Sequence, residues 1–191
     1  MALPRVALLL AAVLLAGCSQ ATVQPTAAPP TALGTTTPTT STTPEASVSD
    51  DLPPPDPAFA AHFTDPVYSD PAGELAPFGT DEGADMLYDW AGRLDELGPD
   101  STVRQLLEGT GFDDMIETLD EPEGPGIPEP AGQVDAATIV IGAGFTLLRL
   151  TGHIDDEGRR LTLRALDILI ARYGSPPEMV RQRADLLSWQ N

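Results

Sequence analysis

Residues 136–148 form a run of thirteen residues without a charged side chain, bounded by Asp135 and Arg149. A helix that crosses a bilayer needs about twenty apolar residues, so this run is too short to span a membrane. We therefore expect a helix buried at the centre of a small domain and apolar on nearly every side. The β-branched stretch 138–141 leaves a buried strand as the alternative. Gly142 and Gly144 lie within the run and indicate close packing against neighbouring helices, since no complete dinucleotide-binding loop surrounds them.

The residues after this run predict a second central helix and a last helix. Asp155, Asp156 and Glu157 are acids of the kind that open a helix, and Gly174 is a stop signal. Apolar residues cover most of the circumference between them, so this helix also belongs in the core. Residues 175–178 read Ser-Pro-Pro-Glu, the pattern of a capping box with proline in the first turn, and predict a helix that runs to about residue 189.

An amphipathic surface helix is expected over residues 81–97. Thr80 is a suitable N-cap, and Gly98-Pro99 stops the helix. At 100° per residue its apolar side chains share one face: Gly83, Met86, Leu87, Trp90, Leu94 and Leu97. Two short helices are expected over 101–108 and 113–119. The predicted fold class is all-α, a small bundle of five or six helices around two apolar central helices.

Two proline- and glycine-containing segments are expected to carry no regular structure. Residues 56–76 are predicted to drape over the domain as an ordered arm, which His62 anchors. Residues 120–133 hold four prolines, three glycines and several acids, and predict an acidic loop.

The charge of the chain excludes two classes of function. It has 10 Lys+Arg, all of them arginine, against 29 Asp+Glu, a formal net charge of −19. A nucleic-acid binder needs clustered cations, and binding to an anionic bilayer by charge needs the same. The excess is uneven, because residues 45–135 carry 23 acids and two arginines whereas residues 136–191 carry six acids and seven arginines. Seven arginines cannot neutralise this excess, so an acidic face must stay exposed.

That face is predicted on the polar side of the helix over 81–97, where Asp81, Asp85, Asp89 and Glu96 cluster. Carboxylates in water have ordinary pKa values and do no acid–base chemistry without a pocket that separates those values. The face is thus a candidate surface for a cationic partner or a loosely held Ca²⁺ ion, or simply a solvated face.

The candidate for enzyme chemistry is the cluster of His153, Asp155 and Asp156. Imidazole and carboxylates can hold a divalent cation, but no helical register directs these three side chains at one point. Acids at a helix N-terminus are favoured by its partial positive charge, so capping is the competing interpretation. Motifs for a serine hydrolase, zinc protease, P-loop or EF-hand do not occur in the sequence.

The N-terminus carries a targeting signal. Arg5 precedes an apolar run of ten residues, 6–15, and Leu15-Ala16-Gly17-Cys18 follows. This tetrad resembles the lipobox of bacterial lipoproteins. The resemblance implies cleavage after Gly17, a covalent diacylglycerol on Cys18, the chain's single cysteine, and attachment to the outer face of the bacterial cytoplasmic membrane. An ordinary secretory signal followed by a free cysteine is the alternative.

Between this signal and the domain lies a tether. Residues 19–55 contain ten threonines, four serines and eight prolines, which cannot bury enough apolar area to fold. The expected organisation is a signal peptide over 1–17, a lipid-anchored disordered linker over 18–55 and an acidic helical domain over 56–191. The Thr/Pro bias also resembles the glycosylated stalks of actinobacterial envelope proteins, although a plain spacer explains the composition equally well.

The start of the surface helix resembles a family of small bacterial helical proteins, the domain of unknown function 4259 family. The matching stretch is residues 77–86, PFGTDEGADM, where Thr80 replaces the usual asparagine and Met86 the usual aromatic residue. The helix around residues 163–166 is similar to that family's last core helix. The resemblance implies an all-helical fold over about 75–191 and brings no activity with it.

Two functions are carried forward from the sequence. The first is a non-catalytic lipoprotein without cofactor, which presents its acidic helical face to an envelope protein. The alternative is a metal-dependent hydrolase-type enzyme that uses His153, Asp155 and Asp156. Neither involves nucleic acid or a transmembrane helix in the mature chain.

Overall fold

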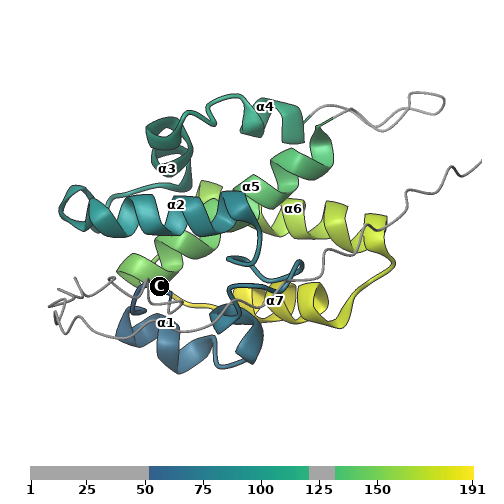
Figure 1. The fold of residues 1–191 in the computed structure, drawn as a ribbon, viewed down its shortest axis with the longest axis horizontal. Helices are drawn as coiled ribbons and strands as arrows, with labels where there is room; N and C mark the ends of the chain where they lie inside the picture. The colour runs from purple at the N-terminus through teal and green to yellow at the C-terminus, as the bar shows by residue number, and fades with distance from the viewer. Residues whose placement is uncertain (1–51, 121–131) are drawn as a thin grey trace, which may run out of the picture. The chain divides into compact units, whose positions relative to one another are not determined.

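The computed structural model describes residues 52–120 and 132–191, and every regular element within them is helical (Figure 1). The expected all-α class is confirmed, with seven α-helices rather than five or six. Their bounds are Pro57–His62 (α1), Asp81–Gly92 (α2), Val103–Thr110 (α3), Met115–Leu119 (α4), Gln133–Thr151 (α5), Asp156–Tyr173 (α6) and Pro177–Ser188 (α7), with short 3-10 turns at Pro66–Ser69 (η1) and Leu94–Glu96 (η2). The predicted signal peptide and nearly all of the tether lie outside the described residues.

The uncharged run lies in α5, the central helix of the bundle (Figure 1). This helix packs against α1, α2, α3, α4 and α6. The alternative of a buried strand over 138–141 is wrong, because these residues belong to α5. The neighbouring helices bury most of the β-branched side chains without a sheet. By length and composition α5 could cross a membrane, yet 72% of its apolar 18-residue stretch is buried inside the bundle. Most of its apolar surface is therefore buried against other parts of the protein.

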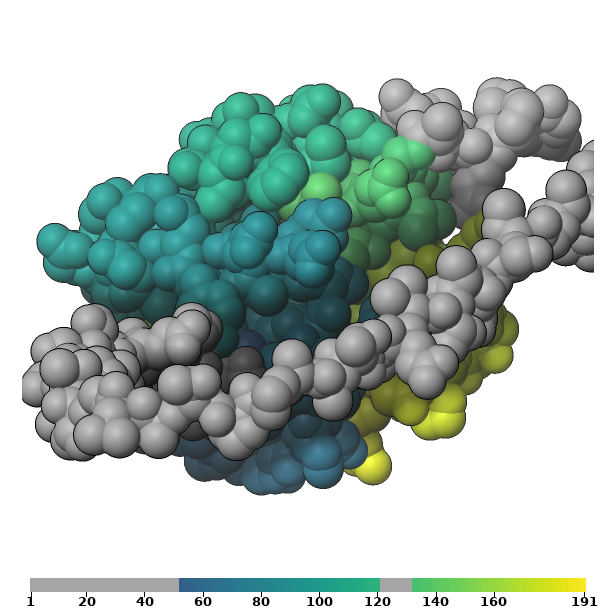
Figure 2. Space-filling model, viewed as in Figure 1, coloured from purple at the N-terminus to yellow at the C-terminus, as the bar shows by residue number. Residues whose placement is uncertain are grey.

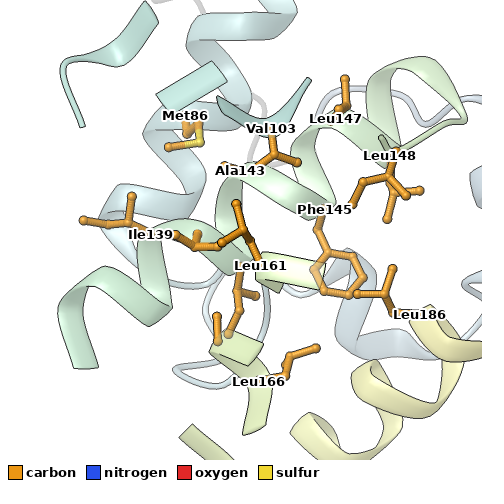
Figure 3. Close-up of a cluster of buried hydrophobic side chains, with 14 of the residues drawn as sticks. Met86, Val103, Ile139, Ala143, Phe145, Leu147, Leu148, Leu161, Leu166 and Leu186 are labelled. Carbon is orange, nitrogen blue, oxygen red and sulfur yellow. The ribbon is translucent and has the colours of Figure 1, made fainter. Parts of the chain in front are cut away.

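Side chains from four other helices meet the buried side chains of α5 (Figure 3). Met86 comes from α2, Val103 from α3, Leu161 and Leu166 from α6, and Leu186 from α7. All of them are buried, as are the α5 residues between them. The two predicted central helices α5 and α6 thus share one continuous hydrophobic core with the surface helices.

Close helix approach at Gly142 and Gly144 is confirmed. An ideal Cβ at Gly142 would lie 3.1 Å from Gly83 Cα on α2. One at Gly144 would overlap the Thr162 side chain on α6, lying 3.0 Å from its Cβ. Two faces of α5 therefore need glycine so that α2 and α6 can pack tightly.

The arm over 56–76 is part of the core rather than a cover over it. It contains α1, which begins with Asp56 as N-cap and Pro57 in the first turn, both of them start signals visible in the sequence. Phe63 lies at the centre of an aromatic cluster, 5.7 Å from the Phe145 ring and 5.3 Å from the Trp189 ring. The arm thereby joins α5 to the C-terminal end of α7.

Arg149 at the end of α5 holds the N-terminal segment in place. Its side chain is only 4% exposed. Nε donates to the Pro53 carbonyl at 2.8 Å and Nη1 to the Tyr68 carbonyl at 2.9 Å. Burial lowers the pKa of the guanidinium, although an arginine stays charged at neutral pH. Residues 52–55, assigned to the tether from composition, therefore contact the bundle.

Several helix ends agree with the sequence signals. The Thr80 side chain accepts from the Gly83 N–H, Asp155 caps α6, and Gly174 ends α6 in the left-handed conformation. The prediction of a capping box at 175–178 is wrong, because Ser175 has φ of +63° and Pro176 occupies the N-cap position. Its proline in the first turn is confirmed.

Other boundaries move by a few residues. The helix expected over 81–97 ends at Gly92, and η2 follows it, so Leu94 is 50% exposed instead of buried. Gln133, placed in the acidic loop from composition, begins α5 and is buried. The rest of that loop, 121–131, lies outside the described residues.

The glycine contacts lead to a first prediction. We expect Gly144→Ala to lower the free energy of unfolding by about 1–3 kcal/mol, because its methyl group overpacks the α5–α6 contact. Gly92→Ala is the matched control, since outside its chain neighbours and its own helix backbone no atom lies within 4 Å of its Cβ position. That variant should be stabilised by up to about 1 kcal/mol. Urea denaturation measures both, and equal stability of the two variants would contradict the close packing.

Candidate functional site: the acidic face of α2

The predicted acidic face is formed by two elements, not one helix. Asp81, Asp85 and Asp89 are exposed on α2, whereas Glu96 is exposed on η2. In the space-filling view α2 and the turn after it form an outer surface of the molecule (Figure 2). The apolar side of α2, with Met86, Leu87 and Trp90, is buried, so the helix places its carboxylates outward.

Arg93 divides this face into two parts. Its guanidinium contacts Asp89 at 3.0 Å and Glu96 at 3.3 Å, and stacks 3.9 Å from the Trp90 ring centroid. It also donates to the Gly109 carbonyl at 3.2 Å. Because all three charged side chains are partly exposed, each pair contributes little to stability. The two ion pairs matter for the charge of the face, because Asp89, Glu96 and Arg93 together carry one net negative charge instead of the two of the acids alone.

The N-terminal part of the face keeps its full charge. Neither Asp81 nor Asp85 takes part in an ion pair with any residue in 52–120 or 132–191. Beside Asp85 and Asp89 lies an open hollow of about 420 Å³, whose far wall includes Gly109, Thr110 and Phe112. Asp85 therefore borders a concave surface between α2 and the end of α3, and Asp81 lies about one helical turn before it.

The arginines of the C-terminal half pair elsewhere. Arg164 contacts Asp120 at 3.2 Å, Arg181 contacts Asp65 at 3.6 Å, and Arg183 pairs with Asp167. The first two connect the later helices to acids of the earlier half, as expected if the charges partly balance within the fold. They do not reach Asp81 or Asp85.

His153, Asp155 and Asp156 are not arranged as a ligand set. His153 Nε2 lies 3.0 Å from the Gly98 carbonyl oxygen, so this nitrogen donates a proton. Asp155 accepts from the Gly158 N–H and from the Val103 N–H, both at 2.9 Å, while Asp156 is exposed. Asp155 thus caps α6 and also holds the first N–H of α3. Among the described residues, no three His, Cys, Asp or Glu side chains are grouped to hold a metal.

A serine, a histidine and an aspartate do meet at the C-terminal end of α7. Ser188 Oγ lies 3.3 Å from His62 Nε2, but Nε2 also faces the Asp185 backbone carbonyl at 2.8 Å. A nitrogen that donates to a carbonyl cannot accept the serine proton, and the Asp185 carboxylate accepts from Tyr68 instead. The grouping attaches α1 to α7, which agrees with the anchoring role expected of His62.

No known protein-family model matches the chain, and no curated protein or solved structure is significantly similar to it. The resemblance of residues 77–86 to the domain of unknown function 4259 family stays a prediction.

Sequence reasoning missed the residues that shape this face and its surroundings. In the sequence Arg93 is one of two arginines in the acidic part of the chain, and its contacts identify it as the partner of two acids. A local signal existed, since Asp89 and Arg93 have the i, i+4 spacing of a helical ion pair. The second partner of Asp155 had no such signal, because Val103 is 52 residues away in the chain.

The double role of Asp155 gives a second prediction. We expect Asp155→Ala to lower the free energy of unfolding by about 2–4 kcal/mol, because it removes an N-cap and leaves the Val103 N–H without a partner. Asp156→Ala is the control and should cost no more than about 1 kcal/mol. Chemical denaturation compares them. A large rise in melting temperature with Ca²⁺, Mn²⁺ or Zn²⁺, lost in both variants, would instead favour the metal site.

Tyr68 gives a third prediction, on alkaline pH. Its hydroxyl is buried and donates to Asp185 Oδ2 at 2.9 Å. Burial, followed by the bond to Asp185 and the charge of that residue, raises the pKa of the Tyr68 phenol. In the unfolded chain this phenol titrates near its ordinary value of about 10. The unfolded state thus loses the proton first, and stability present below about pH 10 decreases as the pH rises further.

The measurement is the free energy of unfolding between pH 8 and 11 for the native chain and for Tyr68→Phe. We expect a steeper fall above about pH 10 in the native chain, because only it carries the Tyr68 phenol. Identical slopes would contradict the role of this hydroxyl.

Proposed function

We propose that the protein is a lipid-anchored lipoprotein of the outer face of a bacterial cytoplasmic membrane, whose helical domain is a non-catalytic interaction module. The observation that carries the proposal is the pair of uncompensated, exposed carboxylates Asp81 and Asp85 on α2, of which Asp85 lines a concave surface. The partner is an envelope protein that presents a cationic patch.

The anchor is supported by the sequence of the N-terminus. Residues 15–18 have the small-residue pattern before a cysteine that lipoprotein processing requires, and Cys18 is the chain's single cysteine. A diacylglycerol supplies two acyl chains, which is enough for stable membrane attachment where one chain is marginal. The residues that follow are rich in threonine and proline and suit a spacer between membrane and domain.

The acidic face is supported by the charge distribution of the described residues. Arg93 pairs with Asp89 and Glu96, whereas Asp81 and Asp85 in the N-terminal half of α2 form no ion pair with a described residue. Complementary charge accelerates association and selects partners more than it adds affinity. A surface of this kind suits reversible recognition of a basic partner at low or moderate ionic strength.

A non-catalytic role is supported by what the reactive side chains do. His62, His153 and Asp155 make structural hydrogen bonds to backbone groups. A metal-dependent hydrolase at His153, Asp155 and Asp156 stays an alternative hypothesis, which the metal titration described above tests.

The experiment is crosslinking and affinity capture of the full chain from native membranes. We expect a specific envelope protein with the native chain and its loss with Asp81→Lys/Asp85→Lys/Asp89→Lys. The matched control reverses three exposed acids outside the face: Asp100, Asp113 and Glu178. It has the same net charge and should keep the partner.

The Cys18→Ala variant tests the anchor in the same experiment. We expect it to leave the membrane fraction, because it lacks the acylated thiol. Persistence in the membrane would contradict lipidation at Cys18. Equal capture by the face variant and the control would contradict the Asp81–Asp85 face as the contact surface.

A further inference from the structure

A second concave site lies on a different part of the molecule. It is a cleft of about 410 Å³ between the segment before α2, the N-terminal half of α5, the end of α6 and the start of α7. Apolar side chains from all four elements line it: Leu75, Pro77, Ile141, Leu169 and Met179. Its size lies in the range of small-molecule sites, and it is more enclosed than the hollow beside Asp85.

One lining residue contains an unsatisfied acceptor. Gln182 on α7 is 1% exposed, and its Nε2 donates to the Leu75 carbonyl at 2.6 Å. This bond defines the orientation of the amide, because the reversed orientation would place two oxygens together. Oε1 has no hydrogen-bond partner in the described part of the chain. A buried acceptor without a partner destabilises the folded state, and a ligand with a donor group would remove that cost.

The polar groups at the cleft favour a cation. Glu74 is exposed and forms no ion pair with a described residue, and Tyr173, 52% exposed, adds a hydroxyl. Among residues 52–120 and 132–191, no arginine or histidine lines the cleft. The cleft thus has an apolar interior, the Glu74 carboxylate and the unsatisfied side-chain oxygen of Gln182. These features match a molecule with an apolar body and a positively charged donor group.

We propose that this cleft binds a small organic ammonium compound. Its apolar body lies between α5, α6 and α7, and its ammonium group points toward the Glu74 carboxylate and the side-chain amide oxygen Oε1 of Gln182. Entry requires a small outward movement beside Gln182, since Oε1 is closed to solvent in this structure. The site does not include Asp81, Asp85 or Asp89, so it is independent of the proposed protein-binding face.

Methyl NMR of the full chain in a non-ionic detergent tests the proposal, with hexylammonium as the probe. Met179 lines the cleft, whereas Met115 does not and serves as the internal reference. We expect a saturable shift of the Met179 methyl signal and none at Met115. Hexanoate, with the same chain and opposite charge, should produce no saturable shift, and ammonium chloride should not reproduce the effect of hexylammonium.

Two variants locate the site. Glu74→Gln should weaken hexylammonium binding about two- to fivefold, as expected for loss of one exposed charge pair. Glu108→Gln removes the same charge on α3, outside the cleft, and should bind as the native chain does. Thr138→Phe fills the cleft from α5 and should abolish the shift. The proposal is overturned by equal binding of hexanoate, by no saturable shift at Met179, or by equal affinity in the Glu74 and Glu108 variants.

Discussion

The uncharged surface of α5 must be covered on all sides, and the rest of the bundle depends on that requirement. No face of this helix can be left in water without exposing apolar area, so α1, α2, α3, α4 and α6 all pack against it. Gly142 and Gly144 let two of these neighbours approach closely. At its C-terminal end Arg149 binds the carbonyls of Pro53 and Tyr68, which brings the N-terminal arm into the same core.

The same arrangement decides where charge can remain. The core helices come mostly from the second half of the chain. Several arginines of this half form ion pairs with acids on other segments or donate to backbone carbonyls. The acidic first half of the chain contains α2, which lies at the outside of the bundle with its acids exposed. Its carboxylates are therefore exposed where few cations are within reach, and the two concave sites proposed for binding both have unpaired acids at their edges.

Local signals predicted most helices because they act within a few residues. Thr80, Asp155 and Gly174 cap their helices as expected, and the uncharged run is the central helix. The errors have physical causes. Proline and glycine made residues 56–76 look irregular, yet α1 forms there because Asp56 and Pro57 start a helix and Phe59 and Phe63 are buried by distant partners. The helix from Asp81 ends early, at a glycine whose successor, Arg93, turns back over Trp90.

The sequence alone determined the all-helical class, the identity of the central helix and the acidic excess, because composition, periodicity and capping are local properties. It also placed Asp81, Asp85 and Asp89 on the polar side of one helix. The tertiary structure decided that Arg93 also donates to the Gly109 carbonyl, that Asp155 serves two helices, and that Glu74 and Gln182 line one cleft. These facts depend on contacts between residues up to 107 positions apart, as in the bond from Gln182 to Leu75. No local pattern encodes such distances, because they follow from how the helices pack around α5.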